Sequence, residues 1–389
     1  MKLIRTVRNH WKKSIFFSLV AAGGGLYGYN RYKENLLLKE YCLKVQNHSA
    51  EKVSTDHKIK DVVVFLNPSS GGGKASKTFK KFAVPMLSCS GINFVIVPTS
   101  YEGHVSSLLK YLPVNVEAVV VAGGDGMLQD TVTAVLRNNK HSQLPVGFIP
   151  LGTHNTFCSR YLHQADSLTN VDAICQSIIN IVEGNVQKVP IMEISPAKGN
   201  TIFALSYFTW GSIKGAIDFI PKLWWLGRLQ TAGAMLRFST STSWPCNIKA
   251  KVDSRVEELA NLTIMPGEKS GLVSHSHPAV RERMEFFELI GRNIIDNRQS
   301  GLLTKLTLGE VPRETDSQEI SVVPLSEGKF FVDGESVDCR TIKIKYLTDS
   351  ISMFVPRNTI PVESVNILPE IPRSISKFMQ TLHDFFGIG

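Results

Sequence analysis

The sequence contains an aspartate inside a glycine-rich turn, and this residue is a candidate for a catalytic carboxylate. Asp125 lies within residues 123–126, which read Gly-Gly-Asp-Gly between an apolar run at 118–122 and a helical pattern. Glycine lets the backbone turn through positive φ and come close to a ligand, and N–H groups at a helix start can converge on an anion. A carboxylate beside phosphates is useful when it binds Mg²⁺ or accepts a proton. The segment therefore indicates phosphoryl transfer to an alcohol.

The turn alone leaves a purely structural interpretation open, because glycine-rich turns between a strand and a helix are common. Two further turns favour a ligand site. An apolar strand at 61–66 leads into Asn-Pro-Ser-Ser-Gly-Gly-Gly-Lys at 67–74, and another at 146–150 leads into a turn with Gly, Thr and Asn at 152–155. Three strand ends would then face one crevice, which is where ligands bind in open α/β sheets.

The common nucleotide-binding motifs do not fit these turns. The segment at 67–74 fails the Walker A pattern, because Pro68 stands where that motif has Gly and Ala75 where it has Ser or Thr. Neither turn contains Gly-x-Gly-x-x-Gly. A Walker NTPase and an NAD-type Rossmann domain are therefore both disfavoured.

Taken in order, these motifs resemble the catalytic domain shared by diacylglycerol, sphingosine, ceramide and acylglycerol kinases. The resemblance spans roughly residues 60–360 and rests on Asn67-Pro68 with Gly71 and Lys74, Thr99 with Gly103-His104, Gly123-Gly124-Asp125-Gly126, Pro150-Leu151-Gly152-Thr153 with Asn155, and Asp333-Gly334-Glu335. The later landmarks are most similar to the mitochondrial acylglycerol kinases: Trp210-Gly211-Ser212, Leu226-Gly227, Phe238-Ser239-Thr240 and Trp244-Pro245.

The resemblance implies ATP and Mg²⁺ as cofactors and assigns the site. Asp125 and Glu335 would be the catalytic and metal-binding carboxylates, with Asp125 favoured as the base and Glu335 as support for nucleotide and metal. The implied nucleotide contacts are Asn67, Pro68, Gly71, Lys74, Thr99, Gly123, Gly124, Gly126, Gly152, Thr153 and Asn155. Two structural readings stay open: residues 333–335 as a plain hairpin turn, which Asp-Gly favours, and the lysines between 74 and 81 as a solvated helix face.

Two positions depart from the family pattern. Met127 stands where many relatives have Thr or Leu, which removes a hydroxyl contact. His154 replaces a frequent glycine at a turn, where a side chain could distort a positive-φ conformation.

The stretch between the Trp-Gly and Leu-Gly landmarks indicates which lipid accepts the phosphate. Sphingosine kinases use an acidic pair there to bind the substrate's amine. Here the interval 212–225 contains one acid, Asp218, one place beyond the second family position, and Gly215 stands at the first. This favours a neutral acylglycerol over sphingosine and leaves Trp210 and Asp218 as candidate substrate residues. An amphipathic lid over 212–220 is the alternative.

The resemblance implies two lobes, an α/β N-terminal lobe with a Rossmann-like, phosphofructokinase-like parallel sheet and a C-terminal antiparallel β-sandwich. The length of 389 residues exceeds a usual single domain, and strand-like runs dominate after about Lys188. We expect residues 59–188 to form the nucleotide-binding domain and 189–365 the β-sandwich, with an inserted loop around 254–313 and a helical candidate near 280–295. Residues 366–389 read as an amphipathic tail.

The first 58 residues indicate targeting and a membrane anchor. Basic residues precede the first acid, Glu34, and flank an apolar run at 15–29. At 15 residues this run is short for a full span of about 20, so it lies in the interface or crosses a thinned bilayer. A signal peptide competes with mitochondrial targeting, but no clear cleavage site follows. Residues 30–58 suit a linker.

The net charge indicates which macromolecules the chain binds, and the cysteine spacing indicates whether it contains disulfides. The net charge of +9 favours anionic membranes, such as those rich in cardiolipin. Nucleic acid is disfavoured because the basic residues are scattered. The six cysteines have no paired spacing and read as free thiols.

These features predict an ATP-dependent lipid kinase that converts monoacylglycerol and diacylglycerol to lysophosphatidic and phosphatidic acid at the mitochondrial inner membrane. Its catalytic lobes are expected to face the intermembrane space. Two alternatives stay open: a non-enzymatic subunit of the inner-membrane translocase for carrier proteins, and a sphingosine or ceramide kinase.

Overall fold

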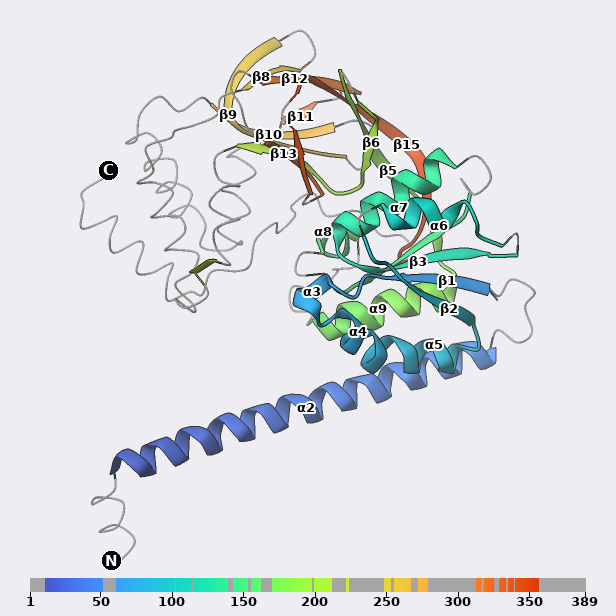
Figure 1. Cartoon of the computed structure of the whole chain (residues 1–389), viewed down its shortest axis with the longest axis vertical. Coiled ribbons are helices and arrows are strands. Elements are labelled where there is room, and N and C mark those ends of the chain that lie inside the picture. The colour runs from blue at the N-terminus through green and yellow to red at the C-terminus, as the bar shows by residue number, and fades with distance from the viewer. Residues whose placement is uncertain are drawn as a thin grey trace, which may run out of the picture.

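The computed structural model describes residues 11–51, 61–101, 103–113, 115–138, 143–152, 155–161, 170–197, 199–211, 222–223, 248–252, 255–266, 272–278, 313–315, 318–324, 329–333, 335–338 and 340–356. These residues form a long N-terminal helix, an α/β lobe and an antiparallel β lobe (Figure 1).

The α/β lobe is built on four parallel strands in the order β2-β1-β3-β4. Their bounds are β1 Asp61–Leu66, β2 Asn93–Pro98, β3 Ala118–Gly123 and β4 Val146–Pro150. Strands β3 and β4 are buried along their whole length, which explains why their sequences are continuously apolar. The prediction of a parallel sheet is confirmed.

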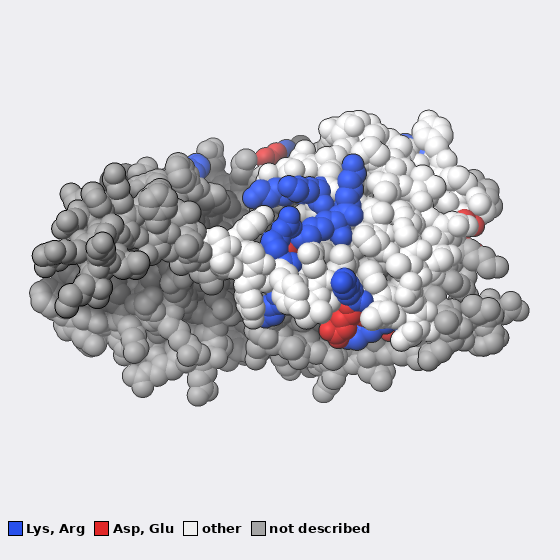
Figure 2. Space-filling model, turned by 90° about the horizontal axis from the view of Figure 1, so that it is seen from below, with Lys and Arg blue, Asp and Glu red and all other residues white. Residues whose placement is uncertain are grey.

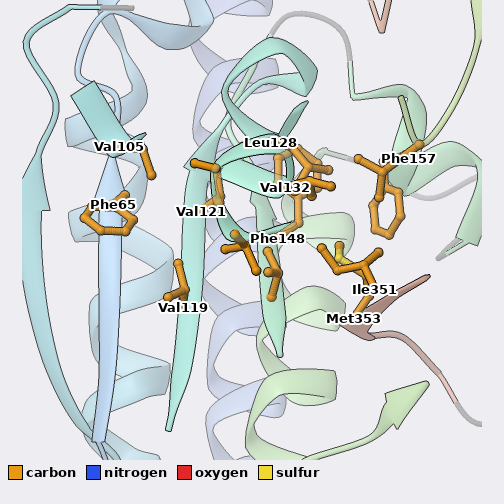
Figure 3. Packing of buried hydrophobic residues seen from close by; sticks show 14 of the residues in the cluster. Phe65, Val105, Val119, Val121, Leu128, Val132, Phe148, Phe157, Ile351 and Met353 are labelled. Carbon is orange, nitrogen blue, oxygen red and sulfur yellow. The ribbon is translucent and has the colours of Figure 1, made fainter. Parts of the chain in front are cut away.

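Helices cover both faces of this sheet. The helices on one face are α6 His104–Leu109, α7 Asp125–Arg137 and α8 Thr156–Tyr161, and those on the other are α5 Val84–Ser90 and α9 Asn170–Glu183. Alternate strand residues divide between the two cores: Phe65 and Val121 pack with α7, while Val64 and Val120 pack with α9. Figure 3 shows the first core, in which Val119 and Val121 of β3 belong to one cluster with Leu128 and Val132 of α7.

The segment after β1 is a chain of short helical turns. It runs through α3 Ser70–Gly73, α4 Ala75–Thr78 and the π-helix η2 Phe79–Ala83 into α5. Pro85 has no N–H for an α-helical bond and lies in the first turn of α5, directly after the wide π-turn.

The antiparallel lobe follows from Val186. Its strands are β5 Val186–Pro196, β6 Ile202–Ala204, β7 Phe208–Gly211, β8 Ile248–Val252, β9 Arg255–Pro266, β10 Leu272–Pro278, β11 Arg313–Thr315, β12 Glu319–Pro324, β13 Lys329–Val332, β14 Glu335–Asp338 and β15 Ile342–Phe354. Where the sequence indicated two stacked sheets, seven of the described strands follow one another in the hydrogen-bonded order β14-β13-β7-β9-β8-β12-β15. Strands β5, β6, β10 and β11 pair off this path, and the core of the lobe includes Phe208 and Phe330.

Strands β5 and β15 connect the lobes. They pair antiparallel from Ile342–Pro196 to Phe354–Val186, with an irregularity between Leu347 and Ile351. One end of this pair packs in the antiparallel core and the other in the α/β core. β15 also lies parallel to β4 through Met353 and Val146, so it completes the sheet of the first lobe.

Part of the inserted loop expected around 254–313 is regular structure. Residues 255–266 and 272–278 form strands β9 and β10, which pair with each other. The charged start of β9 conceals its alternation, in which Leu262 and Ile264 are buried. The helical candidate at 280–295 and the tail at 366–389 lie outside the described residues.

The N-terminal region also differs from expectation. Residues 30–51, which the sequence analysis assigned to a linker, belong with the apolar run at 15–29 to one helix, α2, Trp11–Glu51. The linker assignment is wrong because apolar residues at helical spacing, including Leu37, Leu38, Tyr41 and Val45, pack against the core formed by α5 and α9. The amino half of α2 extends away from the lobe (Figure 1). Within the described residues, none of the helices has the apolar length that a membrane crossing requires.

Candidate active site

The carboxyl ends of the parallel strands meet at one edge, as the sequence predicts. The register aligns Leu66 of β1 with Pro98 and Ala122, and Gly123 with Pro150. The turns that follow are bound to one another: Asn67 N–H donates to Ala122 O at 3.0 Å and Thr99 N–H to Leu66 O at 2.8 Å. The four turns expected to hold nucleotide therefore form one rim.

The Gly-Gly-Asp-Gly turn joins β3 directly to α7. Gly124 is the extended N-cap residue and Asp125 the first residue of the helix. The carbonyl oxygen of Gly123 accepts from the N–H groups of Leu151 and Gly152 at 2.8 and 3.0 Å. This arrangement places a helix start and its unpaired N–H groups at the rim, which is suited to an anion.

The positive φ angles expected in this turn occur in a different one. None of Gly123, Gly124 and Gly126 has positive φ, whereas residues 71–73 have φ of 59°, 65° and 78°. A Cβ on Gly71 would lie 2.6 Å from Leu151 O, so only glycine lets the loop at 67–74 lie against the loop after β4. The glycines of 67–74 are needed for backbone conformation, and Gly126 is needed for space.

The remaining nucleotide candidates line the same rim. Asn67 Oδ1 accepts from Ser69 N–H at 3.0 Å, and the Asn155 side chain bonds both backbone groups of Gly152 at 3.0 to 3.1 Å. The Thr99 hydroxyl donates to Leu66 O at 3.3 Å. Pro68 is half-buried and Lys74 is exposed at the end of the glycine segment. Thr153 and His154 lie outside the described residues.

Asp125 is buried and holds the start of another helix. Its Oδ2 accepts from Thr156 N–H at 2.6 Å and its Oδ1 from Phe157 N–H at 3.4 Å, at the first turn of α8. Burial raises the pKa of Asp125 from 3.8 to about 7, the negative charge of Asp333 adds to the rise, and the bonds from Thr156 and Phe157 oppose it. A carboxyl group that titrates near neutral pH can accept a proton from an alcohol.

Glu335 comes from the other lobe and reaches the same helix start. A Cβ on Gly126 would lie 2.7 Å from both Cγ and Cδ of Glu335, so the two residues are in direct contact. Glu335 begins β14 and pairs with Val332 at the end of β13, so the hairpin interpretation also holds. This β13–β14 hairpin of the antiparallel lobe places the carboxylate of Glu335 beside the start of α7.

The sequence analysis missed two buried charged residues at this junction. Asp333, with φ of 48°, accepts from the N–H groups of Leu205, Ser206 and Tyr207 at 2.8 to 2.9 Å. Burial raises its pKa to about 6, against those three bonds and the charge of Arg160. Arg160, on α8, bonds the carbonyls of Ser206 and Pro266. Arg160 carried no recognisable signal, whereas Asp333 stood within a quoted motif.

Of the two substrate candidates, the structure describes Trp210 alone. Trp210 is buried in the antiparallel core, with its ring 4.9 Å from that of Phe330 in an edge contact. Its indole therefore packs the lobe. Asp218 lies outside the described residues.

The donor set fits Mg²⁺ held together with a nucleotide. No group of three or more His, Cys, Asp or Glu residues gathers at one point within the described ranges. Mg²⁺ with ATP needs only one or two protein carboxylates, because phosphates and waters fill the other positions. Asp125 and Glu335, on either side of Gly126, can supply those carboxylates.

Comparison with known proteins identifies relatives for most of this fold. Residues 61–194 match the diacylglycerol kinase catalytic domain, and residues 8–109 match the inner membrane protein import complex subunit Tim54. The chain is 35% identical to human mitochondrial acylglycerol kinase over 251 residues, which is 64% of this chain and 58% of that protein. Identity to the Xenopus laevis protein of the same name is 32% over 255 residues, 65% of this chain and 59% of that protein. The match therefore spans little more than half of each relative.

More distant proteins share parts of the chain. Human sphingosine kinase 1 is 25% identical over 185 residues, 46% of this chain and 48% of that protein. A crystal structure of a diacylglycerol kinase from Bacillus anthracis superposes with a TM-score of 0.54 at 16% identity and covers 78% of this chain and 99% of that chain. At that identity, the likeness establishes the fold.

Proposed function

We propose that this chain, a relative of the mitochondrial acylglycerol kinases whose residues 61–194 are a diacylglycerol kinase catalytic domain, transfers the γ-phosphate of ATP to the hydroxyl group of an acylglycerol. The observation that carries the proposal is the contact between Glu335 and Gly126, beside Asp125. It gives the phosphate-binding rim two carboxylates from two lobes.

The proposed roles follow from the environments of the two acids. Asp125 takes the proton of the acceptor hydroxyl, because its raised pKa suits a base and because a carboxylate retains acceptor positions beyond the two that α8 occupies. Glu335 is exposed and stands over the helix start, where it can hold the metal of the bound nucleotide. Mg²⁺ neutralises charge on the transferred phosphate when bound.

The rim residues bind and orient the nucleotide. Asn67 and Thr99 bond the ends of the neighbouring strands β3 and β1, and Gly152 bonds Gly123 and the Asn155 side chain of its own loop. These four residues are therefore held in place before ATP binds. The start of α7 directs N–H groups at the phosphates. Pre-organised donors of this kind lower the cost of ordering the substrate.

A neutral acylglycerol is the proposed acceptor. The interval 212–225 contains one acid, Asp218, and so lacks the acidic pair that would bind an amine. Sphingosine or ceramide is the competing acceptor class, supported by 25% identity to sphingosine kinase 1. The products of the proposed reaction are lysophosphatidic and phosphatidic acid.

Transfer of labelled γ-phosphate to a lipid panel tests this function. We expect the purified chain with ATP and Mg²⁺ to phosphorylate monoacylglycerol and diacylglycerol at rates at least about tenfold above the rate for sphingosine, since an unpaired cationic amine is costly to desolvate. Ceramide, whose nitrogen is a neutral amide, tests acceptor shape without that charge. Chromatography of the labelled lipids measures the rates. Preferential transfer to sphingosine would contradict the acceptor assignment, and no transfer to any lipid would contradict the kinase proposal.

A basic face suits this enzyme to an anionic membrane. Figure 2 shows Lys and Arg side chains gathered on one side of the molecule. We define the basic face as Lys74, Lys77, Lys80 and Lys81, which lie on the turns from α3 to η2, together with Arg31 of α2, which shares the partner Glu34 with Lys81. Lys81 bonds Glu34 of α2, which joins the two elements. Exposed aromatic rings at Tyr27, Tyr29 and Tyr32 extend along α2, a residue type that favours membrane interfaces.

Charge reversal on this face is expected to weaken membrane binding. The double variant Lys77→Glu/Lys80→Glu should bind vesicles of phosphatidylcholine with cardiolipin at least about tenfold less tightly, because each cation near an anionic surface contributes roughly 1 kcal/mol. Sedimentation with vesicles measures it. Lys110→Glu/Lys188→Glu, the same charge change at exposed sites off this face, is the control. If both double variants lose the same amount of vesicle affinity, the loss results from the change in net charge and not from this face.

The inner mitochondrial membrane is the proposed location, with the lobes in the intermembrane space. A non-enzymatic role stands beside the kinase role, because the Tim54 match covers residues 8–109, from before α2 to the end of α6. We infer that α2 and the basic face could serve assembly with the import complex for carrier proteins. This second role is compatible with catalysis, since α2 packs on the opposite side of the sheet from α7.

A further inference from the structure

Arg160 lies at the junction of the lobes and is almost fully buried. It is on α8, the helix whose first two N–H groups bond Asp125. Its Nη1 donates to Ser206 O at 3.0 Å and its Nη2 donates to Pro266 O. Ser206 lies between β6 and β7, and Pro266 ends β9. One guanidinium group therefore connects the α/β lobe to two separate segments of the antiparallel lobe.

Ser206 is held from the other side by the turn that carries Glu335. Its N–H group donates to Asp333 Oδ1 at 2.9 Å while its carbonyl accepts from Arg160. The N–H of Asp333 in turn donates to Tyr207 O at 3.0 Å. Asp333 precedes Glu335 by two residues across the β13–β14 turn. A continuous path of short bonds thus runs from Asp125 through α8, Arg160 and Ser206 to Asp333 and Glu335.

We propose that Arg160 is a positioning residue, which fixes the antiparallel lobe against α8 so that Glu335 stands over Gly126. The expected effect of Arg160 on the rate of phosphate transfer rests on the proposed kinase function, whereas its effect on the position of the antiparallel lobe does not. The lobes stay joined without Arg160, because β5 and β15 pair from Ile342–Pro196 to Phe354–Val186 on both sides of the irregularity between Leu347 and Ile351. What Arg160 adds is the angle at which the second lobe meets the first.

Arginine is suited to this task in a way that lysine is not. The planar guanidinium group presents several donors in a fixed geometry and can bond two carbonyls on separate strands, whereas an ammonium group is a single point charge on a flexible stem. Within the described part of the chain, Nε of Arg160 has no partner. Replacement by lysine removes that unsatisfied donor and keeps the positive charge near Asp333, so the fold should tolerate it.

Arg137 provides a matched control. It is also an arginine of the α/β lobe that donates to a carbonyl of the other lobe, Thr201 O, but it is exposed at the far end of α7 from Asp125. A conservative change there removes an interlobe bond without touching the path to Glu335.

The test compares Arg160→Lys with Arg137→Lys in the full chain. We expect Arg160→Lys to lower kcat for lipid phosphorylation about 10- to 100-fold with the KM for ATP changed less than about threefold, because sub-ångström misplacement of a reacting group is costly. Hydrogen exchange should rise at 205–207 and 329–338 and stay unchanged in β1, β3 and α7. Arg137→Lys should change kcat less than about twofold.

Three results would overturn the proposal: unchanged exchange at 205–207 in Arg160→Lys, a kcat equal to that of the unmodified chain, or exchange raised across both lobes together with a higher KM for ATP, which would indicate a general structural role. The exchange measurement needs no activity. If the unmodified chain transfers no phosphate, the proposed kinase function is wrong. A local increase in hydrogen exchange in Arg160→Lys would still support the positioning role of Arg160, and the absence of that increase would contradict it.

Discussion

Replacing Asp125 with asparagine is expected to lower γ-phosphate transfer to acylglycerol about 10²- to 10⁴-fold, the range for loss of a general base. The amide cannot accept the proton of the hydroxyl and is a poorer metal ligand. It keeps the size of the side chain and one oxygen acceptor for the start of α8, where Asp125 now bonds Thr156 and Phe157. The measurement is kcat with labelled ATP and diacylglycerol. Activity within about threefold of the unmodified chain would exclude Asp125 as the base.

The pH dependence of stability provides an independent check on this variant. Burial raises the folded-state pKa of Asp125 to about 7, above its ordinary 3.8. Its stabilising contribution is therefore full below about pH 4 and is lost as pH rises through 7. Without Mg²⁺, Asp125→Asn should gain stability relative to the unmodified chain between about pH 4 and 7, by at most about 1.4 kcal/mol per pH unit, and the difference should stay level above pH 7. A difference in melting temperature that does not change with pH would contradict the burial of an ionisable Asp125.

The same variant separates catalysis from assembly. Carrier protein import into mitochondria that contain only Asp125→Asn should proceed at the normal rate, because α2 packs on the opposite side of the sheet from α7, the helix that Asp125 begins. Loss of import together with loss of transfer would mean that import depends on the lipid product or on the integrity of the site.

Gly126→Ala is expected to reduce kcat about 100-fold while changing the melting temperature by only a few degrees. The added Cβ would meet Cγ and Cδ of Glu335 at 2.7 Å. Glu335 is exposed, so its side chain can swing away at small energetic cost, but it then leaves the helix start. Displacement of about 1 Å at a reacting group costs roughly two orders of magnitude in rate. Steady-state kinetics and thermal unfolding of the same preparation measure both effects.

A double-variant cycle tests the cause. Glu335→Ala should lose as much activity as Gly126→Ala, and combining the two should cost nothing further, because the three atoms nearest to the added methyl group all belong to the part of the Glu335 side chain that alanine lacks. Gly28→Ala, at a glycine of α2 with no neighbouring atom within 4 Å of the added Cβ, should leave activity unchanged. Additive losses in the combined variant would show that alanine at 126 harms the site without acting through Glu335.

Local sequence patterns predicted the rim of the site because its chemistry is encoded in short segments. The buried strands at 61–66, 118–123 and 146–150 are apolar runs that end in glycine-containing turns, and parallel strands bring such ends together. Asp125 was found for the same reason. The roles of these residues in binding and catalysis stay predictions.

The contacts between the lobes could not be predicted in the same way. Arg160 and Pro266 are 106 residues apart in sequence, and Leu205 and Asp333 are 128 apart. No periodicity relates such pairs, and a buried arginine looks like any surface arginine until its partners are known. The β9 strand was taken for a loop because its first residues are charged, and residues 30–51 of α2 were taken for a linker because most of them are polar or charged.

The place of β15 has a consequence for how the chain reaches its native state. This strand pairs with β4 only near residue 353, and Ile351, Met353 and Val355 fill the core beneath α7 and α8. The α/β lobe therefore lacks part of its interior until a segment more than 150 residues beyond its other strands has been synthesised. A chain of residues 59–188 alone would lack β15 and would leave the edge of β4 that pairs with β15 exposed. We expect this lobe to mature late and to need protection during synthesis and import.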